Sequence, residues 1–555
     1  MAGNKTVELL SRELGLSNLC ARILFSRGFS DPRKAKLFLH PKIEDLSDPF
    51  LLPDMEKAVL RVIEAIRTNE KVCIYGDYDA DGVTSAALMI NFLKPLGITP
   101  VVYLPERREG YGLNGAAIRK LKKEGITLLI CLDCGATNVG EIKEANALGI
   151  ETVVIDHHET GDELPPAYAI INPKRKDAQF PTRELAACGV VFFFLLAFRR
   201  VLFRNGQLPR TINLKQELDL VALGTVADMV PLTGDNRIIV KFGMEMMKKK
   251  PRTWLRSFYA SRILARGAVD EYSLGFIIIP RINASGRVSS PDHALRFLVS
   301  EDESASRAML SELHDVNRRR QKIEQEIVRE AVEAIEMENL ADRNSIVLFR
   351  EGWHIGVIGI VAQKLTEMYQ KPSIVITEVD GLWKGSGRGG DGIDLHNIIE
   401  SVSHLVEKFG GHKYACGISL LEENLIPFRD AFDERVEGTL QTREKIIRAD
   451  TSAAFEELTG DLVDFIEMAA PFGMGNPRPN LLLKPYAVRM NNRFAKIIDE
   501  ANHMWHGTFR GRISMPDDER ANIIASPVIK EDMGERFIHL AIKEFVTPEG
   551  VNLPS

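Results

Sequence analysis

The sequence predicts an α/β protein whose first and largest sheet is parallel and doubly wound. Apolar runs of strand length alternate with helix-length stretches between residues 55 and 155, and three of these runs end in acidic or imidazole side chains. Parallel α/β sheets hold ligands at the carboxyl ends of their strands, so both observations favour the same fold. The full expectation is a parallel-sheet domain, a long connecting helix, a smaller α/β domain and a C-terminal OB-like β-barrel.

The elements of the first domain follow one another in a regular order. An N-terminal helical cap over residues 1–50 is expected to precede a domain at 51–300. The expected elements are a helix at 55–68, a strand at 71–75, a helix at 84–93, a strand at 99–104, a helix at 116–123, a strand at 127–132, a helix at 139–147 and a strand at 152–155. The apolar segment 218–226 is expected to continue this series, because it also ends beside an acid, Asp228.

The second half of the chain changes character twice. Residues 301–340 are expected to form a connecting helix, since 301–338 lack Pro and Gly and carry apolar residues at helical spacing. Two strand patterns around a glycine-opened helix predict a second α/β domain at 341–445. From about residue 480, short apolar segments alternate with turn residues, which predicts the OB-like domain within 446–555.

Size and composition are those of a soluble globular protein. A chain of 555 residues exceeds what one core usually serves, so three or four domains are expected. The apolar fraction is 45% and the charged fraction is 27%, which argues against extensive disorder. The longest apolar stretch, 190–198, is far shorter than the ~20 residues that span a bilayer. We therefore expect a cytoplasmic protein with no membrane partner.

The net charge does not exclude a nucleic-acid partner, and the cysteine content argues against a zinc site. A net charge of −6 is compatible with a nucleic-acid partner, because carboxylates gathered around metal ions lower the total without affecting a binding surface. The six cysteines are scattered, which favours core packing in a reducing compartment. Cys131 and Cys134 form one C-x-x-C, but no second pair stands at zinc-site spacing.

An acidic cluster follows the first predicted strand. Asp77, Asp79 and Asp81 alternate before Gly82, as at the start of a calcium-binding EF-hand loop. That loop needs Glu at its twelfth position, where this chain has Leu88, so the EF-hand interpretation fails. Three carboxylates in one turn repel one another without a cation, and we therefore predict a metal site rather than a capped turn.

A second cluster, Asp156-His157-His158, follows the strand at 152–155. Neighbouring side chains diverge at a strand end, so one imidazole can face a metal ion while the other reaches a phosphate. Asp133 and Asp228 also close apolar runs. Mixed carboxylate and imidazole ligands suit Mn²⁺, with Mg²⁺ as a substitute, and the number of ligands fits two ions. Two ions about 3.5–4 Å apart would generate hydroxide at neutral pH, so phosphoester hydrolysis is the predicted chemistry.

Several segments carry donors suited to phosphate. Residues 82–85 open a predicted helix, and Arg107 lies in a loop before a glycine-rich stretch. Residues 280–287 contain Arg281, Asn283 and Arg287. The loops expected at 384–390 and 408–412 pair glycine turns with donors and are predicted to wrap a phosphate. The basic runs 318–320 and 248–250 are expected to be solvated helix faces.

These motifs resemble a known superfamily. Residues 77–82, 132–133, 156–158 and 224–228 are similar to the four motifs of the DHH phosphoesterases, and residues 410–412 resemble the associated DHHA1 domain. Within that superfamily, segments 280–287, 385–388 and 471–477 occur in the order of the RecJ family, from about residue 20 onward.

The resemblance implies removal of nucleotides from the 5′ end of single-stranded DNA, with release of 5′-mononucleotides, in DNA repair and recombination. By motif position, Asp79 and Asp133 would hold one ion, and Asp81, Asp133, His157 and Asp228 the other, with Asp77 close by. Asp156 would orient the histidines, and His158 would contact the scissile phosphate. The residues expected to bind DNA or its terminal phosphate are Arg107, Arg281, Asn283, Arg287, Ser386, Arg388 and His412.

The resemblance also implies partners and marks two departures. Single-strand-binding protein and a repair helicase are the implied partners, and a monomer is expected. The barrel would grip single-stranded DNA by charge and stacking, with Phe494, Trp505 and Phe509 as candidates that fit a core role equally well. Tyr75 stands where some family members have histidine, and Gly389-Gly390 stand where serine and an aliphatic residue are common.

Two alternatives stay open from the sequence. One is a DHH phosphodiesterase of short oligonucleotides or cyclic dinucleotides, with a pyrophosphatase more remote. The extra N-terminal cap and C-terminal barrel suit longer strands instead. The other is a catalytically silent replication scaffold, which the presence of every motif carboxylate and imidazole argues against.

Overall fold

The computed structural model describes residues 2–209, 212–390, 392–438, 449–509, 521–532 and 535–546. The chain forms two compact units, which we describe separately. One comprises Ser47–Asp228 and Phe242–Arg443; the other comprises Met1–Leu46, Met229–Lys241 and Glu444–Ser555. The predicted boundaries of the individual domains stay a prediction.

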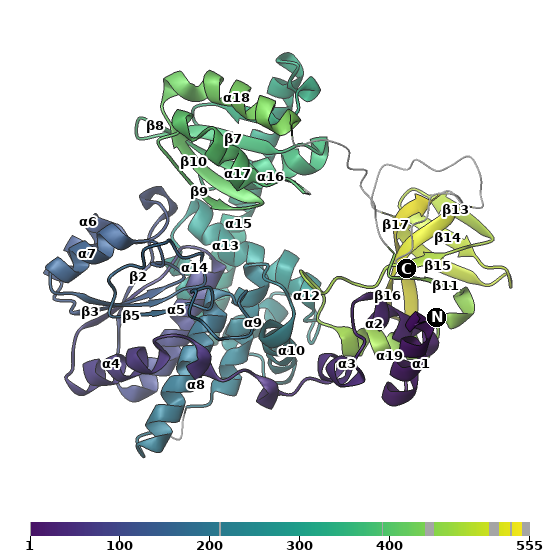
Figure 1. Ribbon diagram of the computed structural model, residues 1–555, viewed down its shortest axis with the longest axis horizontal. Helices are drawn as coiled ribbons and strands as arrows, with labels where there is room; N and C mark the ends of the chain where they lie inside the picture. Colours follow the sequence, from purple (N-terminus) through teal and green to yellow (C-terminus); the bar gives the residue numbers. More distant parts are fainter. Residues whose placement is uncertain are drawn as a thin grey trace. The chain divides into compact units, whose positions relative to one another are not determined.

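The larger unit contains the predicted parallel sheet, with strand order β2-β1-β3-β4-β5 (Figure 1). All four strand pairs are parallel. Its strands are β1 (Val72–Tyr75), β2 (Val101–Tyr103), β3 (Leu128–Leu132), β4 (Glu151–Ile155) and β5 (Ala169–Ile171). β1 and β3 are buried along their whole length, as expected for strands covered on both faces.

Helices cover both faces of this sheet (Figure 1). α6 (Gly115–Lys123) and α7 (Val139–Ala147) share one core with β1 and β3. α5 (Ala80–Leu93) and α8 (Ala187–Arg204) pack against β3, and α4 (Met55–Arg67) packs against α8 and β5. α5 is buried along most of its length, which explains its apolar sequence.

We had expected segment 218–226 to continue the series of strands. It lies instead in the helix α9 (Leu218–Ala227). Every residue of α9 from Leu218 to Thr225 is buried. A run that is apolar on all sides carries no helical periodicity, so its sequence does not distinguish a buried helix from a buried strand. α9 packs against α5 and α8 and still delivers Asp228 at its carboxyl end.

Helices complete the first part of this unit and lead to the second sheet. They are α10 (Gly234–Lys249), which runs through both units, α11 (Thr253–Ala260), α12 (Glu271–Ser273), the π-helical turn η6 (Leu274–Ile278), α13 (Ile279–Val288), α14 (Asp292–Val299) and α15 (Glu303–Met337). The 35-residue α15 confirms the predicted connecting helix. Residues 280–287 thus lie on a helix, α13.

The second sheet has the order β6-β7-β8-β10-β9 and is mixed. Its elements are β6 (Ile346–Phe349), α16 (Ile358–Tyr369), β7 (Ser373–Val379), β8 (Leu382–Arg388), α17 (Leu395–Ser401), β9 (Lys408–His412), β10 (Ala415–Leu420) and α18 (Leu425–Glu437). The predicted loops at 384–390 and 408–412 are therefore mostly strand, β8 and β9. Both pair with β10, which satisfies the backbone of these glycine-rich segments.

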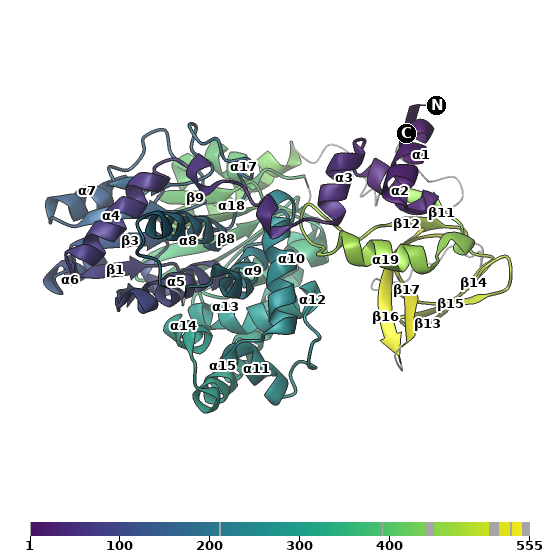
Figure 2. The ribbon, with the colours of Figure 1, turned by 90° about the horizontal axis from the view of Figure 1, so that it is seen from below.

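The smaller unit combines N-terminal helices with the C-terminal β-rich part (Figure 2). Its elements are α1 (Ala2–Leu14), α2 (Asn18–Ser26), α3 (Pro32–Leu39), α19 (Gly460–Ala469) and the strands β11 (Thr451–Ala453), β12 (Leu481–Leu483), β13 (Ala487–Asn491), β14 (Phe494–Ile498), β15 (Met504–Phe509), β16 (Asn522–Asp532) and β17 (Glu535–Val546). The sheet order is β11-β12-β16-β17-β15-β14-β13. Helices and sheet share one hydrophobic core.

None of the helices in the described ranges has both the length and the apolarity that a bilayer-spanning segment requires.

Candidate metal centre

The predicted acidic and imidazole residues meet at the carboxyl edge of the first sheet. Asp77 follows β1, Asp133 follows β3 directly, and Asp156 follows β4 directly. Asp133 has a left-handed backbone, with φ of 63°, which is unusual for a residue with a side chain. Such strain is often retained at functional sites, where the surrounding structure holds it.

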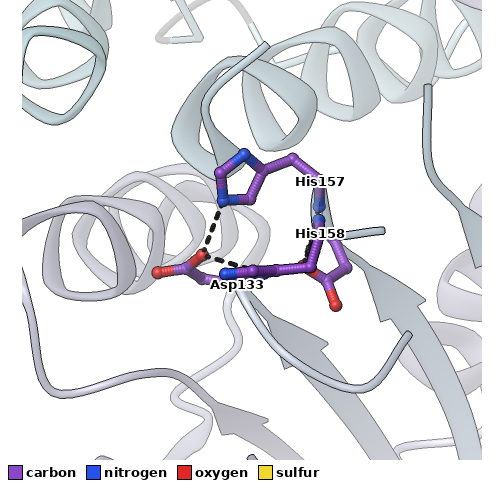
Figure 3. A group of neighbouring side chains, drawn as sticks. Asp133, His157 and His158 are labelled. Carbon is purple, nitrogen blue, oxygen red and sulfur yellow. Dashed lines mark hydrogen bonds and ion pairs between the residues drawn. The ribbon is translucent and has the colours of Figure 1, made fainter. Parts of the chain in front are cut away.

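Three groups of these side chains lie close enough to share a cation. Within each group, one candidate ligand atom per residue lies within 4.8 Å of the others. The groups are Asp77, Asp79 and Asp133; Asp81, His157 and Asp228; and Asp133, Asp156, His157 and His158. Asp133 and His157 each belong to two groups, and their closest atoms, Oδ1 and Nε2, are 3.3 Å apart (Figure 3).

His157 is oriented by a backbone contact. Its Nδ1 lies 2.9 Å from the carbonyl oxygen of Leu185, which can only accept a hydrogen bond. Nδ1 therefore carries the proton, and Nε2 presents its lone pair toward Asp133. Burial, and then the neighbouring His158, lower the pKa of His157 to about 3, so the ring is neutral as a metal ligand must be.

Asp156 accepts hydrogen bonds from both histidines and from a neighbouring backbone group. Its Oδ1 accepts from the backbone N–H of His157 at 2.7 Å and lies 2.8 Å from Nδ1 of His158, while Oδ2 accepts from the N–H of Ala136 at 2.9 Å. Burial alone would lower the pKa of His158, but Asp156 raises it to about 9. His158 is thus held as a cation beside the cluster.

The remaining carboxylates are positioned by helix termini. Asp79 is the N-cap of α5 and accepts from the N–H groups of Asp81 and Gly82 at 2.9 and 3.2 Å. Asp81 accepts from the N–H groups of Ala187 and Cys188, at the start of α8. The helix predicted to open at residues 82–85 thus begins earlier, at Ala80, because Asp79 caps it.

The electrostatics of this cluster favour a bound cation. Burial, and then Asp79, raise the pKa of Asp77 to about 8 and that of Asp81 to about 6. Burial and the neighbouring carboxylates also raise the pKa of Asp133 and Asp228 well above the usual range. Among the described residues, Asp77 Oδ1 is buried and has no hydrogen-bond partner. Divalent ions would satisfy this oxygen and compensate the charge, so the residues fit Mn²⁺ or Mg²⁺.

Three guanidinium groups, one of them stacked on Tyr78, lie near one another. Arg107 packs 4.1 Å from the centre of the Tyr78 ring, Arg287 donates to Gly356 O at 3.2 Å, and Arg388 donates to Ser386 Oγ at 3.2 Å. Burial, and then Arg107 and Arg388, lower the pKa of Arg287 to about 9. Within the described ranges, the hydrogen bonds of the three arginines go to backbone carbonyls and to Ser386. Three guanidinium groups close to one another suit an anion.

Other predicted DNA-binding residues are placed differently. Asn283 Oδ1 accepts from the N–H of Ala80 at 2.8 Å, so it supports the start of α5. Arg281 contacts Ile277 O and, at 3.2 Å, His314 Nδ1 on α15. The side chain of His412 lies outside the described part of the structure.

Sequence reasoning missed several residues that contact the cluster. Tyr111 donates to Asp133 O at 3.1 Å, and its hydroxyl lies 2.8 Å from His158 Nδ1. Its place in a glycine-rich loop after Arg107 was the only available signal. The contacts of residues 185–188 with Asp81 and His157 use backbone groups, which leave no signature in side-chain type.

The stacking candidates of the smaller unit divide into two kinds. Phe494 on β14 is 67% exposed. Trp505 packs against Phe455, and Phe509 packs against Phe545. Trp505 and Phe509 are therefore core aromatics, and only Phe494 is free to stack on a base.

Comparison with known proteins agrees with this geometry. Residues 71–225 match the DHH family, N-terminal domain, and residues 342–438 match the DHHA1 domain. The single-stranded-DNA-specific exonuclease RecJ of Bacillus subtilis is 38% identical over 484 residues, covering 86% of this chain and 60% of the relative. The RecJ exonuclease of Dickeya dadantii is 33% identical over 481 residues, covering 84% of this chain and 83% of the relative.

The chain belongs to the RecJ family.

Solved RecJ structures contain the metals that the site chemistry indicates. RecJ from Thermus thermophilus in complex with Mn²⁺ matches with a TM-score of 0.83 and 26% identity, over 99% of this chain and 78% of that one. The same protein in complex with Mg²⁺ matches with a TM-score of 0.77 and 24% identity, over 98% and 77% of the two chains. The chain thus spans 60% of the length of the Bacillus subtilis relative and 83% of the Dickeya dadantii relative.

The two departures from the RecJ pattern do not remove a ligand. Tyr75 is buried and donates its hydroxyl to Gly112 O at 3.0 Å, so it supports the loop of Tyr111. Gly390, with φ of 73°, follows β8 in a conformation that favours glycine.

Proposed function

We propose that this chain is a metal-dependent exonuclease that hydrolyses single-stranded DNA from the 5′ end to 5′-mononucleotides, in DNA repair and recombination. The main observation behind this proposal is the buried cluster of carboxylates and imidazoles at the sheet edge. In the described structure, this cluster includes a buried oxygen, Asp77 Oδ1, that has no hydrogen-bond partner. RecJ relatives named as single-stranded-DNA-specific exonucleases support the substrate class.

The metal ligands divide between two ions. Asp79 and Asp133 would hold one, with Asp77 beside them, and Asp81, Asp133, His157 and Asp228 would hold the other. When bound, such ions supply an activated water and neutralise charge on the phosphate. Asp156 fixes both histidines through its hydrogen bonds. The cationic His158 then donates a proton toward the scissile phosphate, which a neutral ring would do less well.

The guanidinium cluster suits a terminal phosphate, and the proposed polarity assigns it the 5′-phosphate. Arg107, Arg287 and Arg388 form a cationic group, and a terminal phosphate carries more charge than an internal phosphodiester. A strand whose 5′-phosphate occupies this group would present its first phosphodiester to the carboxylate cluster. Release of one mononucleotide at a time follows from that placement.

The smaller unit offers a second surface for single-stranded DNA. On the outer face of β13, β14 and β15, Arg489 pairs with Lys496, and Lys496 pairs with His506. All three side chains are exposed, and the like charges of Arg489 and Lys496, directly opposite one another, destabilise the sheet unless an anion compensates them. With the exposed Phe494 on the same strands, this row suits a phosphate backbone with stacked bases.

We also propose that the protein acts as a cytoplasmic monomer with single-strand-binding protein and a repair helicase as partners. The two partners rest on the family resemblance alone.

Digestion of single-stranded DNA, duplex DNA and RNA of one sequence, with Mn²⁺, Mg²⁺ or chelator, tests the substrate and the metal requirement. We expect mononucleotides from single-stranded DNA with either metal and none with chelator. Inertness toward every strand together with hydrolysis of a dinucleotide would instead assign the short-substrate phosphodiesterase. Inertness toward both would assign a scaffold.

A further inference from the structure

The backbone turn at residues 185–188, where α8 begins, contacts two proposed metal ligands at once. The carbonyl of Leu185 accepts from Nδ1 of His157 at 2.9 Å. The N–H groups of Ala187 and Cys188 donate to the two carboxylate oxygens of Asp81, at 2.7 and 2.9 Å. These groups are buried, so water does not compete for them.

We propose that this turn is a positioning element for one of the two ions and that Cys188 is a positioning residue within it. The proposal rests on the metal chemistry of the proposed function and adds a structural determinant that none of the recognised motifs contains. Nothing in side-chain chemistry identifies it, because its three contacts come from the main chain.

The two contacts fix complementary properties of the ligands. The Leu185 carbonyl selects the tautomer of His157 whose Nε2 can bind a metal. The first N–H groups of α8 hold both oxygens of Asp81, which fixes the plane of that carboxylate. Each ligand is therefore preorganised by a group that does not itself touch the ion.

The side chain of Cys188 extends this arrangement to a third ligand. Its thiol donates to Val221 O at 3.3 Å and lies 3.7 Å from Thr225 Oγ1, both on α9, the helix that ends at Asp228. A Cβ on Gly224 would lie 2.6 Å from the thiol sulfur and 3.0 Å from Asp81 Oδ1. Glycine at this position thus lets α9 approach both α8 and the carboxylate.

The contacts are selective between the two ions. Asp81, His157 and Asp228 form one candidate group, and each is reached by the turn or by the helix that Cys188 contacts. In the described structure, Asp77, Asp79 and Asp133 form the other group without a hydrogen bond to residues 185–188. Disturbing the turn should lower the affinity for one ion and leave the affinity for the other unchanged.

Two substitutions disturb the turn in different ways. Cys188→Ala removes the thiol, and Cys188→Ser restores a donor. Ala187→Pro removes the N–H that contacts Asp81 and places a ring carbon against that carboxylate. Ala187 is the first helical residue, where proline is favoured, and Ala186 before it has φ −71° and ψ 159°, which proline tolerates.

Calorimetric titration of the full-length, metal-free protein with Mn²⁺ tests the proposal without reference to nuclease activity. We expect two binding events in the wild type. In Cys188→Ala and Ala187→Pro, the affinity of one binding event should fall by about tenfold or more, because residues that hold metal ligands in place typically contribute that much to metal affinity. Cys188→Ser should bind more tightly than Cys188→Ala. Cys73→Ala, which removes a different buried thiol, on β1, should leave both events unchanged.

Three outcomes would overturn the proposal. Two intact binding events in both variants would refute it while leaving the metal site standing. Equal weakening of both events with a lower melting temperature would assign the turn to folding alone. Absence of Mn²⁺ binding by the wild-type chain would overturn the metal chemistry of the proposed function and this inference with it.

Discussion

At the scale of single residues, Asp133 is the carboxylate that the structure places most centrally. It belongs to two candidate metal groups, lies 3.3 Å from Nε2 of His157 and adopts a left-handed backbone at a strand end. A residue shared by two ions affects both when it is removed. Substitution of Asp133 should therefore separate the effect on catalysis from the effect on DNA binding most clearly.

Asp133→Ala is expected to lower cleavage of single-stranded DNA by about 10³-fold or more, because metal stabilisation of the transition state contributes several kcal/mol. Binding of the same strand, measured by fluorescence anisotropy, should stay within a few-fold. Asp162→Ala, at a fully exposed aspartate, is the control and should cleave normally. Hydrolysis at wild-type rate by Asp133→Ala would refute the ligand assignment.

The raised pKa values predict how stability depends on pH and metal. Asp77, with its pKa raised to about 8, binds a proton in the native state at pH values where the unfolded chain does not, and His158, raised to about 9, does the same. The stability that these protons contribute is present at lower pH and is lost as the pH rises through 8 and 9. His157 titrates below this window.

The metal-free protein should therefore melt at a lower temperature at pH 8.5 than at pH 7. Because metal ions replace the protons on the carboxylates, the rise in melting temperature on adding Mn²⁺ should be larger at pH 8.5. Scanning calorimetry with and without the metal measures both quantities. An equal rise at the two pH values would contradict the coupling between protons and metal.

At the scale of elements, the conformation of the loop at 77–82 depends on how closely α13 approaches it. A Cβ on Gly286 would lie 1.9 Å from Tyr78 O, within the loop at 77–82. A Cβ on Gly275, about three turns earlier in the helical segment formed by η6 and α13, would meet nothing within 4 Å. The two glycines provide a matched pair.

Gly286→Ala is expected to displace the loop, to lower stability by about 1–3 kcal/mol and to weaken Mn²⁺ binding. Gly275→Ala should do neither. Denaturant unfolding and metal titration report the two effects separately. If Gly286→Ala binds Mn²⁺ as the wild type does, the loop does not depend on this contact.

Elements are also where prediction from sequence succeeded and failed for identifiable reasons. The strands ending at Tyr75, Leu132 and Ile155 were predictable because their apolar runs are short and each is followed by acids. α9 was not, because a helix buried on every side lacks the period that distinguishes it from a strand. The glycines of β8 and β9 favour turns locally, and only pairing with β10 makes them strands.

The candidate site also contains some features that were predictable from the sequence and others that were not. The carboxylates and imidazoles that the structure brings together were predictable from their residue types, because such residues have few reasons to cluster at strand ends. The contact of Asn283 Oδ1 with the N–H of Ala80 was not predictable, because it joins segments far apart in the sequence, and the role of Asn283 in DNA binding stays a prediction. Contacts made through main-chain atoms, such as that of the Leu185 carbonyl with His157, could not be predicted from the sequence, because every residue has the same main-chain groups.

At the scale of the whole molecule, the account requires a surface outside the catalytic unit that holds single-stranded DNA. The double substitution Arg489→Glu with Lys496→Glu reverses two charges of the exposed row on β13 and β14. It should weaken binding of long strands and make the slope of log K against log salt less steep by about 1.4, since each lost phosphate contact contributes about 0.7 for single strands.

Arg489→Lys keeps the charge and is the control for that experiment. Cleavage of a strand too short to reach the second surface should be unaffected by the charge reversal. Unchanged salt dependence in the double variant would place the DNA-binding surface elsewhere.

The most direct test of the account is digestion of one single-stranded DNA labelled at either its 5′ or its 3′ end, with Mn²⁺. The account predicts that the 5′ label appears as a mononucleotide from the first time point, while the 3′ label stays in progressively shorter strands. Immediate release of the 3′ label, or internal fragments from both substrates, would contradict it.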